Sequence, residues 1–169
     1  MQSIKNLRKA KTQGGFTLIE LLIVIGILAI LLAITLLALN PTQHFQGARN
    51  SQRSSDVTAI LDGIYEYEAA HSGNLPSSVS ALTAGTVYDV RDTGAGNKVD
   101  LCADLVPTYL ADLPIDPDSN FGSKTGTTAC AGGSDTYTTG YTLSRSASSN
   151  RLTIAAPHAE GGSNISVTR

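Results

Sequence analysis

The sequence lacks the residue patterns on which most enzyme sites are built. Its three histidines, His44, His71 and His158, are scattered, and none has a nucleophile motif or a second metal ligand beside it. No glycine motif of the kind that cradles phosphate is present, since Gly132 and Gly133 only lie in a loop rich in Ser and Thr. A chain of 169 residues also has no room for a large multidomain enzyme. We therefore expect a protein that is not an enzyme and that has no catalytic cofactor.

Acidic residues are absent from the first fifteen positions, which hold Lys5, Arg8, Lys9 and Lys11. From residue 16 onward the balance reverses, with eight basic and fourteen acidic side chains. An acidic surface repels phosphate backbones, so direct nucleic-acid binding is not expected, although a local basic patch would escape this argument. The charge distribution divides the chain into a short basic leader, residues 1–15, and an acidic remainder.

Cysteine is scarce, because the chain has only Cys102 and Cys130, both far from the apolar residues near the N-terminus. If this part of the chain lies outside the cytoplasm, the two thiols can pair, and a loop of roughly 27 residues would then contribute about 3 to 4 kcal/mol through chain entropy. The alternative is two unpaired thiols. A zinc site is poorly supported, because neither cysteine has a second Cys or a His at ligand spacing.

One long apolar run is present, at residues 16–39, where only two threonines and Glu20 interrupt the pattern. As a helix of about 1.5 Å per residue, this run extends roughly 36 Å and crosses a bilayer. Basic residues before the run and their scarcity just after it place the N-terminus in the cytoplasm and the remaining chain outside. A cleaved secretory signal would have a shorter apolar core. A plain anchor leaves Glu20 unexplained, because a carboxylate in an apolar run costs up to a few kcal/mol and needs a positive partner.

The residues KTQGGFTLIELLIVIGILAIL, at positions 11–31, resemble the processing and assembly signal of type IV prepilins and of the pseudopilins of type II secretion. The resemblance implies that a prepilin peptidase cuts between Gly15 and Phe16 and that the new amine of Phe16 is methylated. It also implies that Glu20 becomes the fifth residue of the mature chain. The partners that follow are the membrane before assembly, an inner-membrane assembly machinery, and further copies of the chain in a filament.

The physical chemistry of Glu20 agrees with this resemblance. Cleavage after Gly15 removes all four leader charges and creates an amine at Phe16, one helical turn from Glu20 or beside the Glu20 of a neighbouring subunit. An unpaired carboxylate in an apolar filament core is heavily penalised, so a stagger that pairs it with an amine is favoured. We expect Glu20 to set the registry of assembly; the alternative is a polar residue tolerated near the membrane surface.

After the apolar run, the pattern predicts an amphipathic helix over residues 40–73 that ends near His71. Asn40 and Pro41 either start a second helix, as N-cap and first helical residue, or Pro41 kinks one continuous helix, which is the interpretation we favour. Charged residues such as Arg53 and Asp56 fall mostly away from the apolar face. That face, at spacings of three and four, consists of Ala48, Val57, Ile60, Leu61, Ile64 and Tyr65.

The region from residue 74 to 169 is expected to fold as a globular part outside the cytoplasm. Residues 76–135 are interpreted as loops with short helices near 78–82 and 107–111. A hairpin of strands 137–145 and 151–156 follows, and a strand at 165–168 adds an edge. The fold class is therefore α+β: a long N-terminal helix, hydrophobic in its first half (residues 16–39) and amphipathic in its second, packed on a small antiparallel sheet. The resemblance implies the same ladle shape.

A turn at residues 110–122 has two interpretations. Asp116, Asp118 and Asn120 alternate as at the start of a calcium loop, and hard oxygen ligands suit calcium. The later Glu of an EF-hand is absent, however, and the same residues are ordinary turn formers. The major pseudopilins that this segment resembles bind calcium in a C-terminal loop.

Three functions remain open from the sequence. The first is a subunit of a type IV pilus-like filament that serves adhesion, twitching motility or DNA uptake. The second is a pseudopilin of a type II secretion system, in which case the filament stays in the periplasm. The third is a membrane-tethered binding module outside the cytoplasm that acts as a monomer. In each case the precursor is a single-pass protein of the inner membrane.

Overall fold

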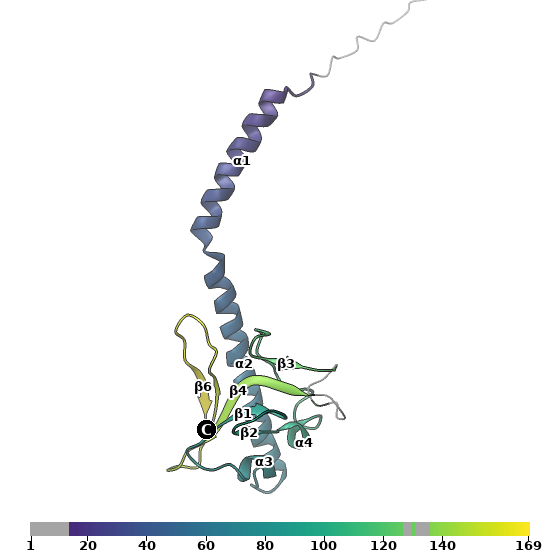
Figure 1. Ribbon diagram of the computed structural model, residues 1–169, viewed down its shortest axis with the longest axis vertical. Helices are drawn as coiled ribbons and strands as arrows, with labels where there is room; N and C mark the ends of the chain where they lie inside the picture. The colour runs from purple at the N-terminus through teal and green to yellow at the C-terminus, as the bar shows by residue number, and fades with distance from the viewer. Residues whose placement is uncertain (1–13, 127–129, 131–135) are drawn as a thin grey trace, which may run out of the picture. The chain divides into compact units, whose positions relative to one another are not determined.

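The structure is a computed structural model that describes residues 14–126, 130 and 136–169 (Figure 1). The leader residues 1–13 and the loop residues 127–129 and 131–135 lie outside this description. The chain divides into two compact units, Met1–Pro41 and Thr42–Arg169. The sheet and the buried core both lie in the second unit.

Among the described residues of the first unit, α1 (Leu18–Leu39) is a helix long and apolar enough to cross a membrane. Thr17 caps its N-terminus with an extended backbone, and its side-chain oxygen accepts a hydrogen bond from the Glu20 backbone N–H. Asn40 ends the helix in the left-handed conformation, with φ of 39°. No residue of α1 is buried, so its apolar surface has no cover within the described residues.

The next helix, α2 (Pro41–Ala70), starts immediately after Asn40 with proline as its first residue. Proline is favoured there because its φ is already helical and the amide proton that it lacks would have no partner. The chain therefore forms two helices separated by Asn40, and the continuous helix kinked at Pro41 is wrong. The predicted end near His71 is confirmed, since Ser72 and Gly73 both have positive φ and turn the chain away.

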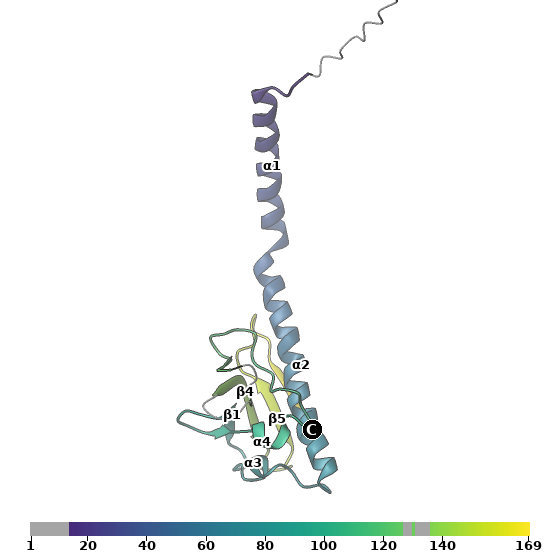
Figure 2. The same ribbon diagram turned by 90° about the vertical axis from the view of Figure 1, so that its right-hand side faces the viewer.

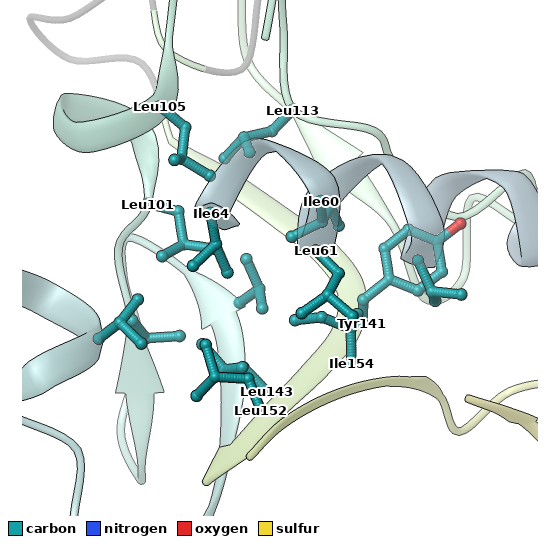
Figure 3. Close-up of a cluster of buried hydrophobic side chains, with 14 of the residues drawn as sticks. Ile60, Leu61, Ile64, Leu101, Leu105, Leu113, Tyr141, Leu143, Leu152 and Ile154 are labelled. Carbon is teal, nitrogen blue, oxygen red and sulfur yellow. The ribbon is translucent and has the colours of Figure 1, made fainter. Parts of the chain in front are cut away.

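The core lies between α2 and the sheet. Val57, Ile60, Leu61 and Ile64 of the predicted apolar face are fully buried, whereas Ala48 is exposed. Figure 3 shows Ile60, Leu61 and Ile64 among side chains of the sheet and of the preceding loops. The other residues labelled there, from the sheet, the loops and one short helix, are Leu101, Leu105, Leu113, Tyr141, Leu143, Leu152 and Ile154. This face of α2 is the predicted partner of the C-terminal region.

The described residues form a sheet of six strands, in the order β2-β1-β4-β5-β6, with β3 paired to β4 off this path. Figure 2 shows the sheet beside the C-terminal half of α2. The hairpin and the edge strand predicted from the sequence are confirmed. The sheet is mixed and not antiparallel throughout, because β1 and β2 pair in parallel. The strands are β1 (Val87–Arg91), β2 (Lys98–Val99), β3 (Ser123–Lys124), β4 (Tyr137–Arg145), β5 (Leu152–Ala156) and β6 (Ile165–Thr168).

The segment between α2 and β4 holds more regular structure than the sequence predicted. Three of the strands, β1 to β3, lie in it, and the short helices are α3 (Ser77–Ser80) and α4 (Cys102–Leu105). The helix predicted at residues 107–111 is therefore wrong: α4 ends before Val106, which is extended because the following residue is Pro107. The overall class is α+β, as the sequence indicated.

Candidate processing and assembly site

Gly15 and Phe16 lie in a non-helical segment directly before α1. Both are exposed, with 78% of Phe16 accessible, and no atom lies within 4 Å of a Cβ built on Gly15. A peptidase needs an accessible peptide bond that is not held in a helix or sheet, and exposed segments of this kind are the usual sites of cleavage. The Gly15–Phe16 bond meets this condition in the chain itself.

Glu20 is the third residue of α1, and Thr17 is its N-cap. The Thr17 side-chain oxygen accepts the Glu20 N–H at 3.2 Å, so the segment has the Thr-x-x-Glu spacing of a capping box. A carboxylate in the first turn also interacts favourably with the positive end of the helix dipole. We therefore expect Glu20 to help start α1, in addition to any role between subunits. The Thr-x-x-Glu spacing is visible in the sequence, but the charge of Glu20 was interpreted there only as a partner for the Phe16 amine, of the same chain or of a neighbouring subunit.

The remaining surface of α1 is apolar on every side. Exposed Ile, Leu and Val side chains follow one another along the whole helix, and Glu20 is its one charged residue. A helix that is apolar all round is stable in lipid or among similar helices and is unfavourable in water. The composition of α1 thus fits both a membrane and a bundle without change.

The comparisons with known proteins agree with this geometry. Residues 10–36 match the family model of the prokaryotic N-terminal methylation motif, which is the type IV prepilin-like signal. The match includes Gly15, Phe16 and Glu20. The chain therefore carries a type IV prepilin-like signal over residues 10–36. No curated protein and no solved structure matches the chain.

A second group of functional candidates lies in the unit Thr42–Arg169. Cys102, at the start of α4, forms a disulfide with Cys130, and their Cα atoms are 5.3 Å apart. This bond connects α4 to the loop that precedes β4.

The calcium candidates have other partners. Asp116 is buried, and its two carboxylate oxygens accept hydrogen bonds from Nε and Nη2 of Arg53, each at 2.8 Å. One oxygen also accepts the Asp118 N–H, and the Asp118 carboxylate in turn accepts two bonds from Asn120. The described residues contain no group of three His, Cys, Asp or Glu that could hold a metal ion. In this geometry the three residues form a turn that Asp116 anchors to α2. Calcium binding by Asp116, Asp118 and Asn120 together stays a prediction, and it would require Arg53 to release the Asp116 carboxylate.

Sequence reasoning missed the buried charges of α2. Arg53 is fully buried on the apolar face and contacts both Asp116 and Glu160. Its hydrogen bonds to Asp116 and Glu160 raise the pKa of the guanidinium, although burial opposes this. Asp56 is also buried and accepts a hydrogen bond of 2.6 Å from the Tyr141 hydroxyl. The helical spacing of Arg53 and Asp56 relative to Val57 and Ile60 could have indicated that they lie on the core face. The sequence prediction placed them in solvent because they are charged.

Glu160, in the turn after β5, also contacts the arginines of α2. The Glu160 carboxylate accepts two hydrogen bonds of 2.6 Å from Arg49 and one of 3.1 Å from Arg53. These bonds, with those from Arg49 the strongest, lower the pKa of Glu160 from 4.5 to about 2. The three histidines are not brought together: His71 stacks on Tyr67, His158 stacks on Phe121, and His44 is exposed.

Proposed function

We propose that this protein is the structural subunit of a type IV pilus-like filament. The observation that carries the proposal is the methylation motif at residues 10–36, which begins in the basic leader and continues into an uncovered apolar helix. In this proposal the precursor sits in the inner membrane with its N-terminus in the cytoplasm. A prepilin peptidase cuts after Gly15, the Phe16 amine is methylated, and α1 then moves from lipid into a bundle of identical helices. The filament serves adhesion, twitching motility or DNA uptake.

Glu20 supplies specificity to this assembly. The cleaved chain carries a positive amine at Phe16 four residues before the carboxylate, and both are exposed in the single chain. Removing either charge from water without the other is strongly unfavourable, so subunits stack in the stagger that pairs them. The protein has no enzymatic role in this proposal, and its partners are the peptidase, the assembly machinery and other copies of itself.

The experiment that tests the proposal is mass spectrometry of filaments sheared from cells that produce the full chain. A dominant species in the sheared fraction that begins with methylated Phe16 supports a filament subunit. Processed protein that stays in the envelope, with none in the sheared fraction, would instead indicate a pseudopilin or a tethered binding module. An uncut chain that begins at Met1 would contradict the proposal altogether. The matched control is Gly15→Leu, which blocks processing and leaves the leader attached.

A further inference from the structure

The sheet is interrupted in the middle of β4. On one side of this strand, β3 pairs with Tyr137 and Thr138, and β5 takes over from Thr142 onward, so Gly140 and Tyr141 lack a ladder partner there. On the other side the register with β1 shifts, because Asp89 faces Thr142 whereas Arg91 faces Thr138. Bulges of this type bend a strand and redirect its side chains, and they are frequent beside binding sites.

The interruption is held by specific hydrogen bonds. The Thr139 hydroxyl donates to the Val90 carbonyl at 2.8 Å and accepts the Tyr141 N–H at 3.1 Å. The Thr139 carbonyl accepts the Asp116 N–H at 2.8 Å. The Thr139 carbonyl, the Tyr141 N–H and the Val90 carbonyl therefore have partners outside the regular ladder.

A hollow of about 110 Å³ lies at this interruption. Thr138, Gly140 and Thr142, the half-buried residues of β4, line the hollow together with the buried Val90 and Tyr141. Pro157 and His158, which follow β5, form another part of its wall. The residues around it are Asp89, Val90, Phe121, Thr138, Gly140, Tyr141, Thr142, Pro157 and His158.

Several polar groups around the hollow have no partner. Within the part of the chain that the structure describes, no hydrogen bond is formed by the hydroxyls of Thr138 and Thr142 or by the ring nitrogens of His158. Asp89 is the one carboxylate of the wall, and Arg91 balances it with an ion pair of 3.2 Å. The hollow therefore offers hydroxyl, imidazole and carboxylate groups for hydrogen bonding while its net charge is close to zero.

One wall of the hollow contains two flat, stacked rings, those of Phe121 and His158. The rings of Phe121 and His158 stack with centroids 3.7 Å apart and planes within 4°, and Phe121 remains 38% exposed. Stacking against His158 fixes the orientation of the Phe121 ring. Rigid aromatic side chains present contact area at little cost in conformational entropy, and their faces are suited to C–H groups.

We propose that this hollow binds one neutral pyranose ring at the end of a glycan. A pyranose has a C–H face that fits a flat apolar wall and a rim of hydroxyls that fits Thr, His and carboxylate partners. A cation would have to compete with Arg91 for Asp89, and an anion would meet the Asp89 carboxylate. The volume is well under the ~300 Å³ at which pockets start to enclose drug-sized ligands, so a single ring is the largest occupant.

The proposed binding belongs to the unit Thr42–Arg169 and requires neither cleavage nor assembly. For one ring with a few hydrogen bonds, we expect dissociation constants on the order of millimolar. Many copies on one filament or surface would raise the effective affinity for a branched glycan.

Saturation-transfer NMR on the full chain tests the proposal. The chain is kept in a detergent without sugar headgroups, and the probes are the methyl glycosides of glucose, galactose, mannose, N-acetylglucosamine and N-acetylgalactosamine. We expect transfer to the C–H protons of at least one glycoside, and a weaker effect for the free reducing sugar. Methyl phosphate and choline, the charged comparison probes, are expected to show none.

Variants assign the signal to the hollow. Thr142→Val keeps the shape of the side chain and removes its hydroxyl, and Phe121→Leu removes the flat wall; each should weaken binding at least fivefold. Ser144→Ala, on the same face of β4 but outside the hollow, is the matched control and should leave binding unchanged. If Phe121→Leu is unfolded by circular dichroism, Thr142→Val alone decides. The proposal is overturned by absent transfer from all five glycosides, by binding only of a charged probe or of the reducing sugar, or by unchanged binding in Thr142→Val.

Discussion

The Arg53 guanidinium and the Asp116 carboxylate form a bidentate pair in which both side chains are completely buried. The pair joins α2 to the turn before β3, two segments that are 63 residues apart in the chain. Burying two charges is expensive, and good geometry with additional hydrogen bonds is what offsets this cost. In this pair Asn50 and Glu160 accept further bonds from Arg53, and the Asp118 N–H donates to Asp116.

Removal of one partner should be strongly destabilising. Arg53→Met leaves the Asp116 carboxylate buried and unpaired, so we expect the free energy of unfolding to fall by about 3–5 kcal/mol. Urea unfolding of the full chain in detergent measures this. Near-UV circular dichroism is the suitable signal, because all six tyrosines lie in the unit Thr42–Arg169 and tryptophan is absent.

Two further variants separate charge from packing. Arg151→Met removes an exposed arginine with a single bond to the Thr168 carbonyl, and its effect should stay within about 0.5 kcal/mol. The double variant Arg53→Met with Asp116→Leu removes both charges and should recover most of the loss. A double variant as unstable as Arg53→Met alone would show that packing, and not the unpaired carboxylate, determines the cost.

Glu160 gives the stability a specific dependence on pH. Its pKa is about 2 in the folded chain, against an ordinary value of 4.5. Because the folded pKa is the lower one, the contribution is complete above pH 4.5 and is lost as the pH falls from there toward 2. The difference in urea midpoint between the native chain and Glu160→Gln should therefore be constant at neutral pH and shrink in this acidic window.

An exposed glutamate provides the comparison for this titration. Glu66 is exposed and has no ion pair among the described residues, so Glu66→Gln serves as the surface control for the loss of one glutamate and should change the urea midpoint little at neutral pH. A constant difference between the native chain and Glu160→Gln down to about pH 2 would show that the Arg49 and Arg53 contacts do not hold the carboxylate in its charged form.

Position 140 favours glycine for two reasons, its positive φ and the lack of space for a Cβ atom. Its φ is 81°, and an added Cβ would lie 2.8 Å from the Asp116 Cβ and 3.1 Å from the Phe121 carbonyl oxygen. We expect Gly140→Ala to lower the free energy of unfolding by about 1–3 kcal/mol through strain and overlap. Gly47→Ala is the opposite case: this position is helical with nothing within 4 Å, so the variant should be neutral or up to about 1 kcal/mol more stable. Equal effects in the two variants would contradict this explanation.

Periodic patterns were sufficient to predict much of this structure. Val57, Ile60, Leu61 and Ile64 repeat at helical spacing, and β4 and β5 alternate between buried and half-buried positions, so local sequence reveals both elements. The motif around Gly15, Phe16 and Glu20 was equally visible, because its residues are contiguous.

The remaining features depend on contacts that are distant in sequence. β2 and β3 have two residues each, too few for any period, and they exist because β1 and β4 provide partners. Arg53 and Asp56 are charged residues that are buried because they bind Asp116 and Tyr141. These partners lie 63 and 85 residues away in the sequence, so local patterns do not reveal them. The hollow beside Gly140 has the same origin, because its walls come from β1, β4 and the turns before β3 and after β5.

Glu20 can be tested in a way that separates its two roles. Glu20→Gln removes the charge and keeps a side chain that suits a capping box, so α1 should start normally and the precursor should still be inserted and cut. If the charge sets the registry of subunits, the variant should yield far less sheared filament than the native chain. Glu20→Ala, which removes both functions, should be at least as defective in assembly while its processing remains largely intact.

Thr17→Ala is the matched control for the cap. It removes the acceptor of the Glu20 N–H and should cost about 1 kcal/mol of helix stability, while the Glu20 charge remains. Processing is followed by the mass of the mature chain, and assembly by the amount of protein in the sheared fraction. Normal filament yield from Glu20→Gln, together with a defect in Thr17→Ala, would assign Glu20 to the start of the helix and remove its role in registry. We expect the opposite: a low filament yield from Glu20→Gln and a normal yield from Thr17→Ala. A neutral side chain at position 20 is not stabilised by pairing with the Phe16 amine of a neighbouring subunit, so no stagger of the subunits is preferred.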